Sequence, residues 1–377
     1  MRRAAQLALD QRTLLLIYAA AAVVVSIQRG VFGFPNDFAI FRASFWNLVA
    51  HRDLYVLRLQ QAHDYFKYSP SFALLFGPFA ILPFVVGLFL WNLVNALAIF
   101  FALRLVLPRQ QWAIAQVLVS LPALRSMQSA QSNALVTALI ILAFVSFDRD
   151  WLGRGGFAVA LGAVIKIFPL AAITFALPRP NRARAVLTTA GATLILIALP
   201  LIVISPRALG AQYQSWMALE RIEANLVGDS TLQLLRDAGF NFPLWTVQLI
   251  GVAVVLSVLA YRMRDWNDPK LRLRFLGFVM VFCVVFNHRA ERQSAVIAVT
   301  GMVTWYLASS RAAWRTAFFA IVYALVSLSG SVIVPDAIKH ALTPELRFSI
   351  PLTILWLVML CELTIIPKEP LPIAEAV

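Results

Sequence analysis

The sequence is poor in charge and in cysteine. Of its 377 residues, 13% are charged and 61% are hydrophobic, whereas a soluble domain usually carries about 25% charged residues. The two cysteines, Cys283 and Cys361, both fall within apolar runs. They are predicted to be small buried hydrophobic side chains and give no basis for a disulfide framework. The composition therefore predicts a polytopic membrane protein.

The motifs of soluble nucleotide and metal sites are also missing. The sequence has no GxGxxG, no Walker lysine motif, no HExxH and no metal-spaced cluster of histidine and cysteine. These absences argue against an ATP-driven pump and against a nucleotide-sugar enzyme with a cytoplasmic domain. We expect no cofactor and no metal ion. Internal repeats are not evident either, which weakens the case for a transporter built from duplicated halves.

What the chain has instead is a series of apolar runs. A helix needs about 20 apolar residues to cross the hydrocarbon core. The series predicts an all-α bundle of about 10 to 12 transmembrane helices in one integral membrane domain over residues 1–377. The candidate segments are 13–29, 71–86, 88–107, 111–124, 130–147, 155–178, 185–204, 244–261, 273–287, 293–308, 316–334 and 348–366.

The formal net charge of +14 comes from arginines and lysines in the connections between these runs. This distribution follows the positive-inside rule and does not indicate a nucleic-acid partner. Basic clusters at 179–184, 262–274 and 311–315 occupy every second connection, which predicts that these connections are cytoplasmic. The first outward loop is then 30–70 and the second is 205–243.

The start of the chain supports this orientation. Arg2, Arg3 and Arg12 precede the first apolar run, a pattern that resembles a signal peptide and that we interpret as a retained first span. Arg104 and Arg109 do not fit, because they lie outside if every candidate segment crosses once.

Both outward loops are long enough to fold. In the first, apolar side chains between Phe38 and Val49 recur at helical spacing, which predicts an interfacial helix. In the second, Asp229 or Ser230 is predicted as an N-cap and Gly239 as the end of the helix that follows.

Asp37 is the first candidate for chemistry. It follows the first apolar run and lies between Phe34 and Phe38. A carboxylate at the boundary between membrane and water costs stability unless it is solvated or used, and apolar neighbours raise its pKa toward a range suited to accepting a proton. Asp37 is therefore predicted as a general base, as the N-cap of a helix that begins at Phe38, or as both.

The short outward connection 287–293 concentrates polar side chains. Arg289 and Arg292 suit a lipid phosphate, because a guanidinium keeps its charge in a partly dry site and binds phosphate through two hydrogen bonds. Glu291 could orient one of them, and His288 ranks below the arginines. The alternative is a solvated turn whose charges pair with lipid headgroups.

Lys166 lies within the apolar run 155–178. A lysine at that depth costs about 2.5–3.5 kcal/mol unless it meets a polar partner. It is predicted to face inward, with snorkelling to an interface as the alternative. Pro169 loosens the helix beside it. The polar stretch 125–133 could hydrogen-bond sugar hydroxyls or form an ordinary loop.

Together these residues resemble glycosyltransferase family 87, polytopic enzymes of the GT-C type that use polyprenyl-phosphate sugars. Two elements depart from the family pattern: Ala130 stands where the family often has glycine, and Gly228-Asp229-Ser230 stands where an asparagine-serine element is common. The elements that carry the resemblance are, in order, Asn36-Asp37-Phe38, Leu54-Tyr55, Tyr68-Ser69-Pro70, Gln131-Ser132-Asn133, Lys166-Ile167-Phe168-Pro169 and Asn287-His288-Arg289-Ala290-Glu291.

The resemblance implies that an acceptor hydroxyl loses its proton to Asp37 and attacks the anomeric carbon with inversion. Polyprenyl phosphate would then depart from the opposite face. Positive side chains stabilise that leaving group. The implied donor-phosphate residues are Arg289, Arg292, Lys166 and His288, and the implied sugar or acceptor contacts are Asn36, Tyr68, Gln131, Asn133 and Glu291.

The implied sugar is a hexose such as mannose, and the acceptor is a lipid or glycan at the periplasmic or exterior face of a bacterial inner membrane. The alternative is a transporter or flippase of a lipid-linked sugar or small solute, with Lys166 and the 287–293 connection as its polar pathway. The long outward loops favour the enzyme, because transporters usually keep their loops short and concentrate their polar residues near the midplane.

Overall fold

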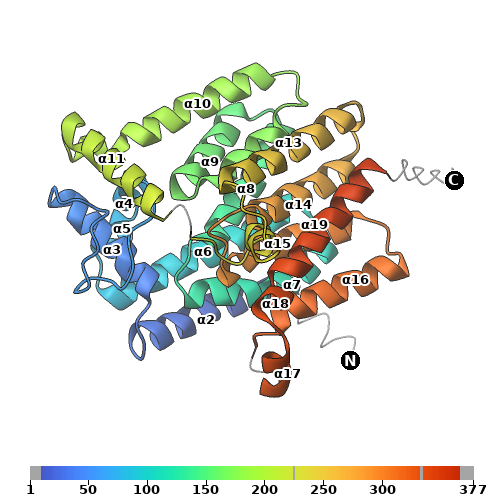
Figure 1. Ribbon diagram of the computed structural model, residues 1–377, viewed down its shortest axis with the longest axis horizontal. Helices are drawn as coiled ribbons and strands as arrows, with labels where there is room; N and C mark the ends of the chain where they lie inside the picture. The colour runs from blue at the N-terminus through green and yellow to red at the C-terminus, as the bar shows by residue number, and fades with distance from the viewer. Residues whose placement is uncertain (1–9, 224–225, 332–333, 366–377) are drawn as a thin grey trace.

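The computed structural model describes residues 10–223, 226–331 and 334–365, and the regular elements of these ranges are helices, without strands (Figure 1). Arg2 and Arg3 lie outside the described residues. The bundle is formed by α2 (Gln11–Gly30), α6 (Phe84–Val106), α7 (Arg109–Gln128), α8 (Asn133–Asp148), α9 (Leu152–Ile165), α10 (Arg182–Ala198), α13 (Leu244–Arg262), α14 (Pro269–Val285), α15 (Ala295–Ala308), α16 (Ala313–Tyr323) and α19 (Ser349–Thr364).

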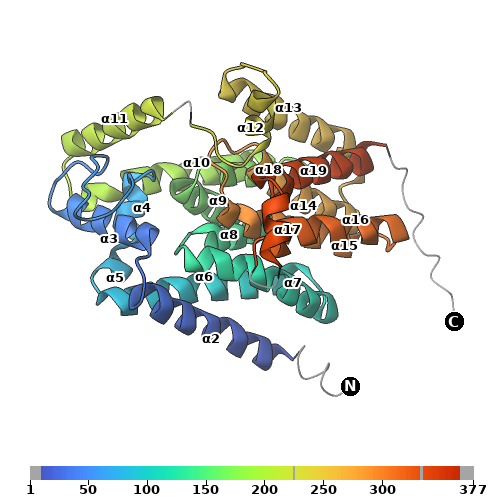
Figure 2. The same cartoon turned by 60° about the horizontal axis from the view of Figure 1, so that its bottom comes forward.

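Shorter helices connect these segments. They are α3 (Asn36–Val49), α4 (Pro70–Leu75), α5 (Gly77–Ala80), α11 (Pro206–Ile222), α12 (Thr231–Asp237), α17 (Asp336–Ala341) and α18 (Pro344–Arg347). Figure 2 shows α3, α4, α5 and α11 gathered at one end of the molecule, which we call the outer-loop end.

The prediction of an all-α polytopic membrane protein is confirmed. Four helical segments of the described chain are long and apolar enough to cross a membrane: Gln11–Gly30, Phe84–Val106, Arg182–Ile202 and Leu244–Asp265. Their apolar side chains are largely uncovered, as expected where lipid replaces a protein neighbour. Leu194 and Ile195 of α10, for example, are 66% and 69% exposed.

The centre of the bundle is the antiparallel pair α14 and α15. Nearly every side chain of α15 is buried, so this helix is apolar on all sides, as a helix surrounded by other helices must be. The two backbones meet at Gly277 and Gly301, where a Cβ on Gly277 would lie 2.5 Å from the carbonyl oxygen of Gly301. Glycine at both positions permits this close approach.

The expected span 71–86 is wrong. The structure breaks this stretch into α4 and α5, which stay beside α3 at the outer-loop end (Figure 2). Pro78 and Pro83 explain the break, because proline removes a backbone donor and clashes with the carbonyl four residues earlier. Gly77 is also required here, since a Cβ would lie 2.7 Å from the ring of Phe45 on α3.

The expected single span 155–178 is also wrong, because the chain reverses at Lys166. Helix α9 ends at Ile165, and a 3-10 segment, η1 (Phe168–Phe175), runs back beside it. The Cys283 thiol near the end of α14 contacts the Phe168 carbonyl oxygen at 3.6 Å. The Phe175 ring meets Phe275, near the start of α14, at 6.1 Å between centroids. Segment η1 therefore runs antiparallel to α14.

Pro169 accounts for this reversal. A proline at that position removes a backbone donor and clashes with the carbonyl of Ile165, which disfavours continuation of α9, and Gly162 leaves room for it, since a Cβ there would lie 2.8 Å from the Pro169 side chain. Lys166 is thus at the tip of a hairpin at the outer-loop end and not at the middle of a span.

One expected crossing is lost at 71–86 and one is gained by the reversal at Lys166, so the total number of crossings is unchanged. Arg104 and Arg109 then no longer conflict with the positive-inside rule. Arg104 donates to Gln11, and Arg109 lies 3.7 Å from Asp10, so both arginines lie at the start of α2, away from the outer loops. Asp148, the last residue of α8 and thus at the end opposite Asn133, pairs with Arg179 and Arg272. The basic clusters of the sequence thus belong to the end opposite the outer loops.

The structure has helices in both loops that were predicted to face outward, 30–70 and 205–243, with corrected details. Helix α3 begins at Asn36, and Asp37 lies in its first turn without a side-chain capping bond, so the N-cap interpretation of Asp37 is wrong. In the second loop, Ser230 precedes α12 but makes no capping hydrogen bond. Gly239 follows α12 with a φ of 88°, which is the left-handed conformation expected at a helix end. Cys283 is buried as predicted, whereas Cys361 is exposed.

The contact between α14 and α15 makes a stability prediction. Gly277→Ala forces two backbones apart, and overpacking of this kind costs about 1–3 kcal/mol. We expect a lower melting temperature for the detergent-solubilised variant in a thermal unfolding assay.

Gly191→Ala on α10 is the matched control, because nothing lies within 4 Å of its Cβ position. Removal of a helical glycine there should be neutral or slightly stabilising. Equal melting temperatures for the two variants would show that the close approach does not constrain the bundle.

Candidate active site

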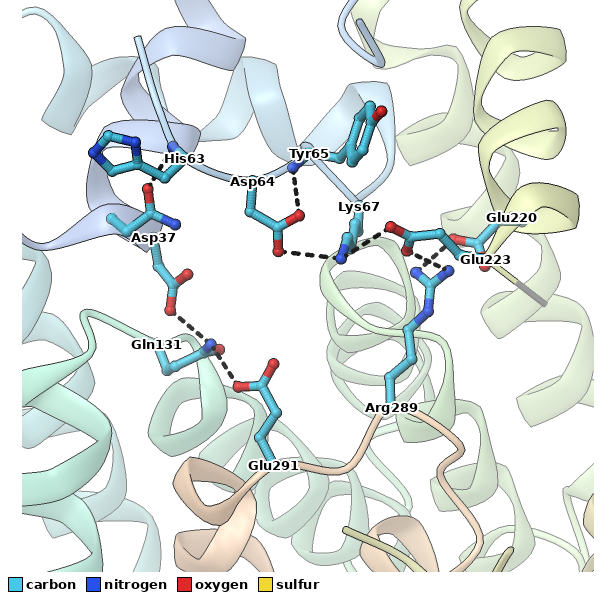
Figure 3. A network of polar contacts seen from close by, with 11 residues as sticks. Asp37, His63, Asp64, Tyr65, Lys67, Gln131, Glu220, Glu223, Arg289 and Glu291 are labelled. Atoms are coloured by element: carbon cyan, nitrogen blue, oxygen red, sulfur yellow. Dashed lines mark hydrogen bonds and ion pairs between the residues drawn. The ribbon is translucent and has the colours of Figure 1, made fainter. Parts of the chain in front are cut away.

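The side chain of Gln131 joins the polar residues that the sequence singled out. Its Nε2 donates to Asp37 Oδ2 at 2.7 Å and lies 3.4 Å from Glu291 Oε2 (Figure 3). Its Oε1 accepts from Lys166 Nζ at 3.2 Å. Four segments that are distant in sequence therefore meet at one amide group.

Lys166 makes a second bond at the same place. Its Nζ donates to Asn133 Oδ1 at 2.7 Å, and it lies 5.9 Å from the centroid of the Tyr68 ring. The ammonium thus has two amide oxygens and an aromatic face as neighbours, which compensates for its removal from water. The predicted polar partner of Lys166 is present.

Asp37 lies where an ionised carboxylate is costly. Burial, followed by the negative charge of Glu291, raises the pKa of Asp37 to about 7, although the charge of Lys166 and the hydrogen bond from Gln131 act in the opposite direction. A carboxylate with this pKa is present in both protonation states near neutral pH. It can therefore accept a proton more readily than an ordinary aspartate.

The backbone that presents Gln131 is strained. Ala130 has a φ of 53°, the left-handed region that favours glycine, and glycine is what the family pattern often has at this position. The Ala130 carbonyl accepts a 2.7 Å hydrogen bond from the indole of Trp91 on α6. This bond holds the turn between α7 and α8, and with it the Gln131 side chain.

A cavity of about 540 Å³ opens beside Asp37. Its charged lining consists of two arginines, Arg29 and Arg292, and three carboxylates, Asp37, Asp229 and Glu291. Arg292 is partly exposed and approaches Asp229 at 3.8 Å. The cavity therefore places cationic groups and the candidate base around one volume that is large enough for part of a substrate.

Arg289, by contrast, is engaged in ion pairs. Its guanidinium approaches Glu220 Oε1 at 3.0 Å and Glu223 Oε2 at 3.1 Å. Glu223 in turn pairs with Lys67 at 3.2 Å, and Lys67 pairs with Asp64 at 3.1 Å (Figure 3). This chain of charges ties the two outward loops to the 287–293 connection.

The remaining predicted residues lie around this centre. Asn36 lines the cavity, and its Oδ1 accepts from the backbone of His63 at 2.8 Å. The Tyr68 carbonyl accepts from the Tyr55 hydroxyl at 2.8 Å. His288 lies 3.2 Å from Gln248, and burial, followed by the charge of Arg289, lowers its pKa. His288 is not among the residues that line the cavity.

Two sets of functional candidates were missed from the sequence. Arg29 lines the cavity, and its Nε has no hydrogen-bond partner among the described residues. A signal existed, because an arginine at the end of the first span that the sequence predicts to be outward departs from the positive-inside rule. The ion pair between Lys67 and Glu223 had no such signal, since it joins residues more than a hundred positions apart.

Comparison with known families agrees with this arrangement. The model of glycosyltransferase family 87 matches residues 66–287, more than half of the chain. The chain belongs to glycosyltransferase family 87. The matched stretch contains Gln131, Asn133 and Lys166, whereas Asp37 and Glu291 lie outside it and reach the centre through Gln131. No curated protein matches the chain. Membership of the family makes this membrane protein a glycosyltransferase.

The ion pairs of Arg289 generate a prediction for this family member. Arg289→Met leaves the buried Glu223 with only one of its two cationic partners. An incompletely satisfied buried polar group costs about 1–3 kcal/mol. We expect faster limited proteolysis within residues 205–243 and a lower melting temperature.

Arg221→Met is the matched control, since Arg221 is an exposed residue at the end of the same helix, α11. If Arg289→Met and Arg221→Met were equally resistant to protease, the ion pairs would not hold the second loop.

Proposed function

We propose that this glycosyltransferase moves a sugar from a polyprenyl-phosphate donor to a hydroxyl of a lipid or glycan acceptor, at the outward face of a bacterial inner membrane. The observation that carries the proposal is that Asp37, Arg29 and Arg292 line the same cavity. A proton acceptor for the hydroxyl and cationic groups that stabilise the departing phosphate are the groups that suit this reaction.

Asp37 is the proposed general base. The acceptor hydroxyl gives its proton to the free carboxylate oxygen of Asp37 as its oxygen bonds to the anomeric carbon. The bond between that carbon and the phosphate oxygen breaks on the opposite side, so the anomeric configuration inverts. The carboxylate is available for this role because Gln131 occupies only Oδ2.

Arg292 and Arg29 are the proposed ligands of the donor phosphate. Both line the cavity, and a guanidinium stabilises the charge that develops on the departing phosphate. Arg289 and Lys166, which the sequence also suggested, do not line the cavity: Arg289 pairs with Glu220 and Glu223, and Lys166 hydrogen-bonds Gln131 and Asn133. We therefore transfer the phosphate role to Arg292 and Arg29.

The outward orientation follows from the arginine distribution. The basic clusters belong to the end opposite the outer loops, which the positive-inside rule assigns to the cytoplasm. Asp37 and its cavity then face the periplasm or exterior. A hexose such as mannose is the proposed sugar, by analogy with the family. Family membership and the cavity at the outer loops favour this enzyme over a transporter of lipid-linked sugars.

The base assignment predicts a loss of activity and a pH dependence. Asp37→Asn should fold in membranes but should not transfer sugar from a radiolabelled polyprenyl-phosphate hexose. In the unsubstituted protein, kcat/KM should fall as the pH drops through about 7, because protonated Asp37 cannot accept a proton.

Membranes lacking the protein are the control, and labelled product is followed by chromatography. Full transfer by Asp37→Asn, or a rate that is constant between pH 5 and pH 9, would contradict the role of Asp37.

The phosphate assignment predicts a donor-specific defect. A hydrogen bond to a charged group contributes about 1.5–3 kcal/mol, so Arg292→Gln should lower kcat/KM for the donor by about 10- to 100-fold. Arg292→Lys should lower kcat/KM less than Arg292→Gln does, because lysine keeps the positive charge although it lacks the planar guanidinium fork.

Arg221→Gln, at an exposed arginine that is not among the residues lining the cavity, serves as the control. Unchanged donor kinetics in Arg292→Gln and in Arg29→Gln would rule out the proposed phosphate site.

A further inference from the structure

Lys166 is not among the residues that line the cavity, although it belongs to the polar centre. Its two hydrogen-bond acceptors are Gln131 Oε1, from the turn between α7 and α8, and Asn133 Oδ1, from the first residue of α8. The ammonium therefore faces the amide side chains of this turn. A binding role in the cavity leaves these two bonds unexplained.

The Gln131 amide has an acceptor end and a donor end, and its surroundings match both. The Oε1 end meets the ammonium of Lys166, and the Nε2 end meets the carboxylates of Asp37 and Glu291. A rotation of the amide by 180° would place its oxygen against two carboxylates and its nitrogen against a cation. Lys166 thus selects the one orientation in which Asp37 receives a hydrogen bond.

The backbone on either side restricts Gln131 further. The left-handed Ala130 is pinned by Trp91, and Asn133 opens α8 with a fully buried side chain. A strained residue persists only where its surroundings hold it, and such residues gather at functional sites. The turn that carries Gln131 therefore has little freedom to move, and it holds the Gln131 side chain beside Asp37.

We propose that Lys166 is a positioning residue that acts on Asp37 through the Gln131 amide. The inference rests on the proposed function, because it presupposes that Asp37 is the base. With the amide held in place, Asp37 Oδ2 is occupied and its other oxygen is left for the acceptor hydroxyl. Glu291, which meets the same Nε2, is the second carboxylate that this orientation accommodates.

The electrostatics of the site agree with this arrangement. The charge of Lys166 and the hydrogen bond from Gln131 both lower the pKa of Asp37, against the raising effects of burial and Glu291. Loss of either side chain should therefore raise the pKa of Asp37 further. The acid limb of the pH profile would then move to higher pH.

A double-mutant cycle tests the proposal in purified full-length protein with a polyprenyl-phosphate hexose as donor. The variants are Lys166→Met, Gln131→Leu and the double variant, with kcat measured on the alkaline plateau so that the titration of Asp37 does not contribute. Each single variant should lower kcat by about 10-fold or more and shift the acid limb upward, with donor KM changed by less than about 2-fold.

The double variant should be no slower than Gln131→Leu alone on the alkaline plateau, because the direct effect of the Lys166 charge on the pKa of Asp37 does not contribute there and the hydrogen-bonded route is lost with the amide. Lys166→Gln carries the same cycle if Lys166→Met does not reach the membrane. Multiplicative effects would overturn the proposal, and so would a raised donor KM with an unmoved acid limb, which would make Lys166 a phosphate ligand. An active Asp37→Asn would instead refute the proposed base, so the two failures are distinguishable.

Discussion

The need of buried charges for polar partners organises the outer-loop end of this protein. A carboxylate and an ammonium placed at the end of an apolar bundle are costly unless each is hydrogen-bonded. Gln131 serves both groups, because its amide donates to Asp37 and accepts from Lys166. The reversal at Pro169 brings Lys166 to this amide, and the first turn of α3 brings Asp37. The strained turn at Ala130 places the amide itself.

The charged residues fall into two groups with different consequences. Arg289 is neutralised by Glu220 and Glu223, which joins the 205–243 loop to the connection after α14, and the pair of Glu223 with Lys67 adds the 30–70 loop. Arg29 and Arg292 line the cavity, where a substrate anion can meet them. Arg289 and Arg292 are only three positions apart in the sequence, yet one forms ion pairs within the protein and the other lines the cavity. Their spacing in the sequence does not reveal this difference.

Much of the bundle could be predicted from the sequence, because apolar runs of sufficient length specify helices in a membrane. The errors arose at prolines. The stretch 71–86 is apolar enough to span, yet Pro78 and Pro83 divide it, and Pro169 turns 155–178 into two antiparallel arms. A hydropathy average over a window of residues does not detect a single proline that breaks the helix.

The centre of the site could be predicted in part. Asp37 and Lys166 were recognisable because a charge next to apolar residues demands an explanation. Gln131 was named only as a sugar or acceptor contact through the family resemblance, and its role as their common partner was not predictable, since it lies 94 residues from Asp37 and an uncharged amide carries little signal in a sequence. The engagement of Arg289 was likewise hidden, because its carboxylate partners lie 69 and 66 residues earlier in the sequence, on and just after α11.

The contact of Gly277 with Gly301 has a mechanical consequence for Glu291. The connection that carries Glu291 is the tip of the hairpin formed by α14 and α15, whose arms touch backbone to backbone. A hairpin joined in this way resists shear when the surrounding bilayer thickens or thins, whereas a lone tilted helix responds by changing its tilt. The separation between Glu291 and Asp37 should therefore be insensitive to acyl-chain length in the host membrane.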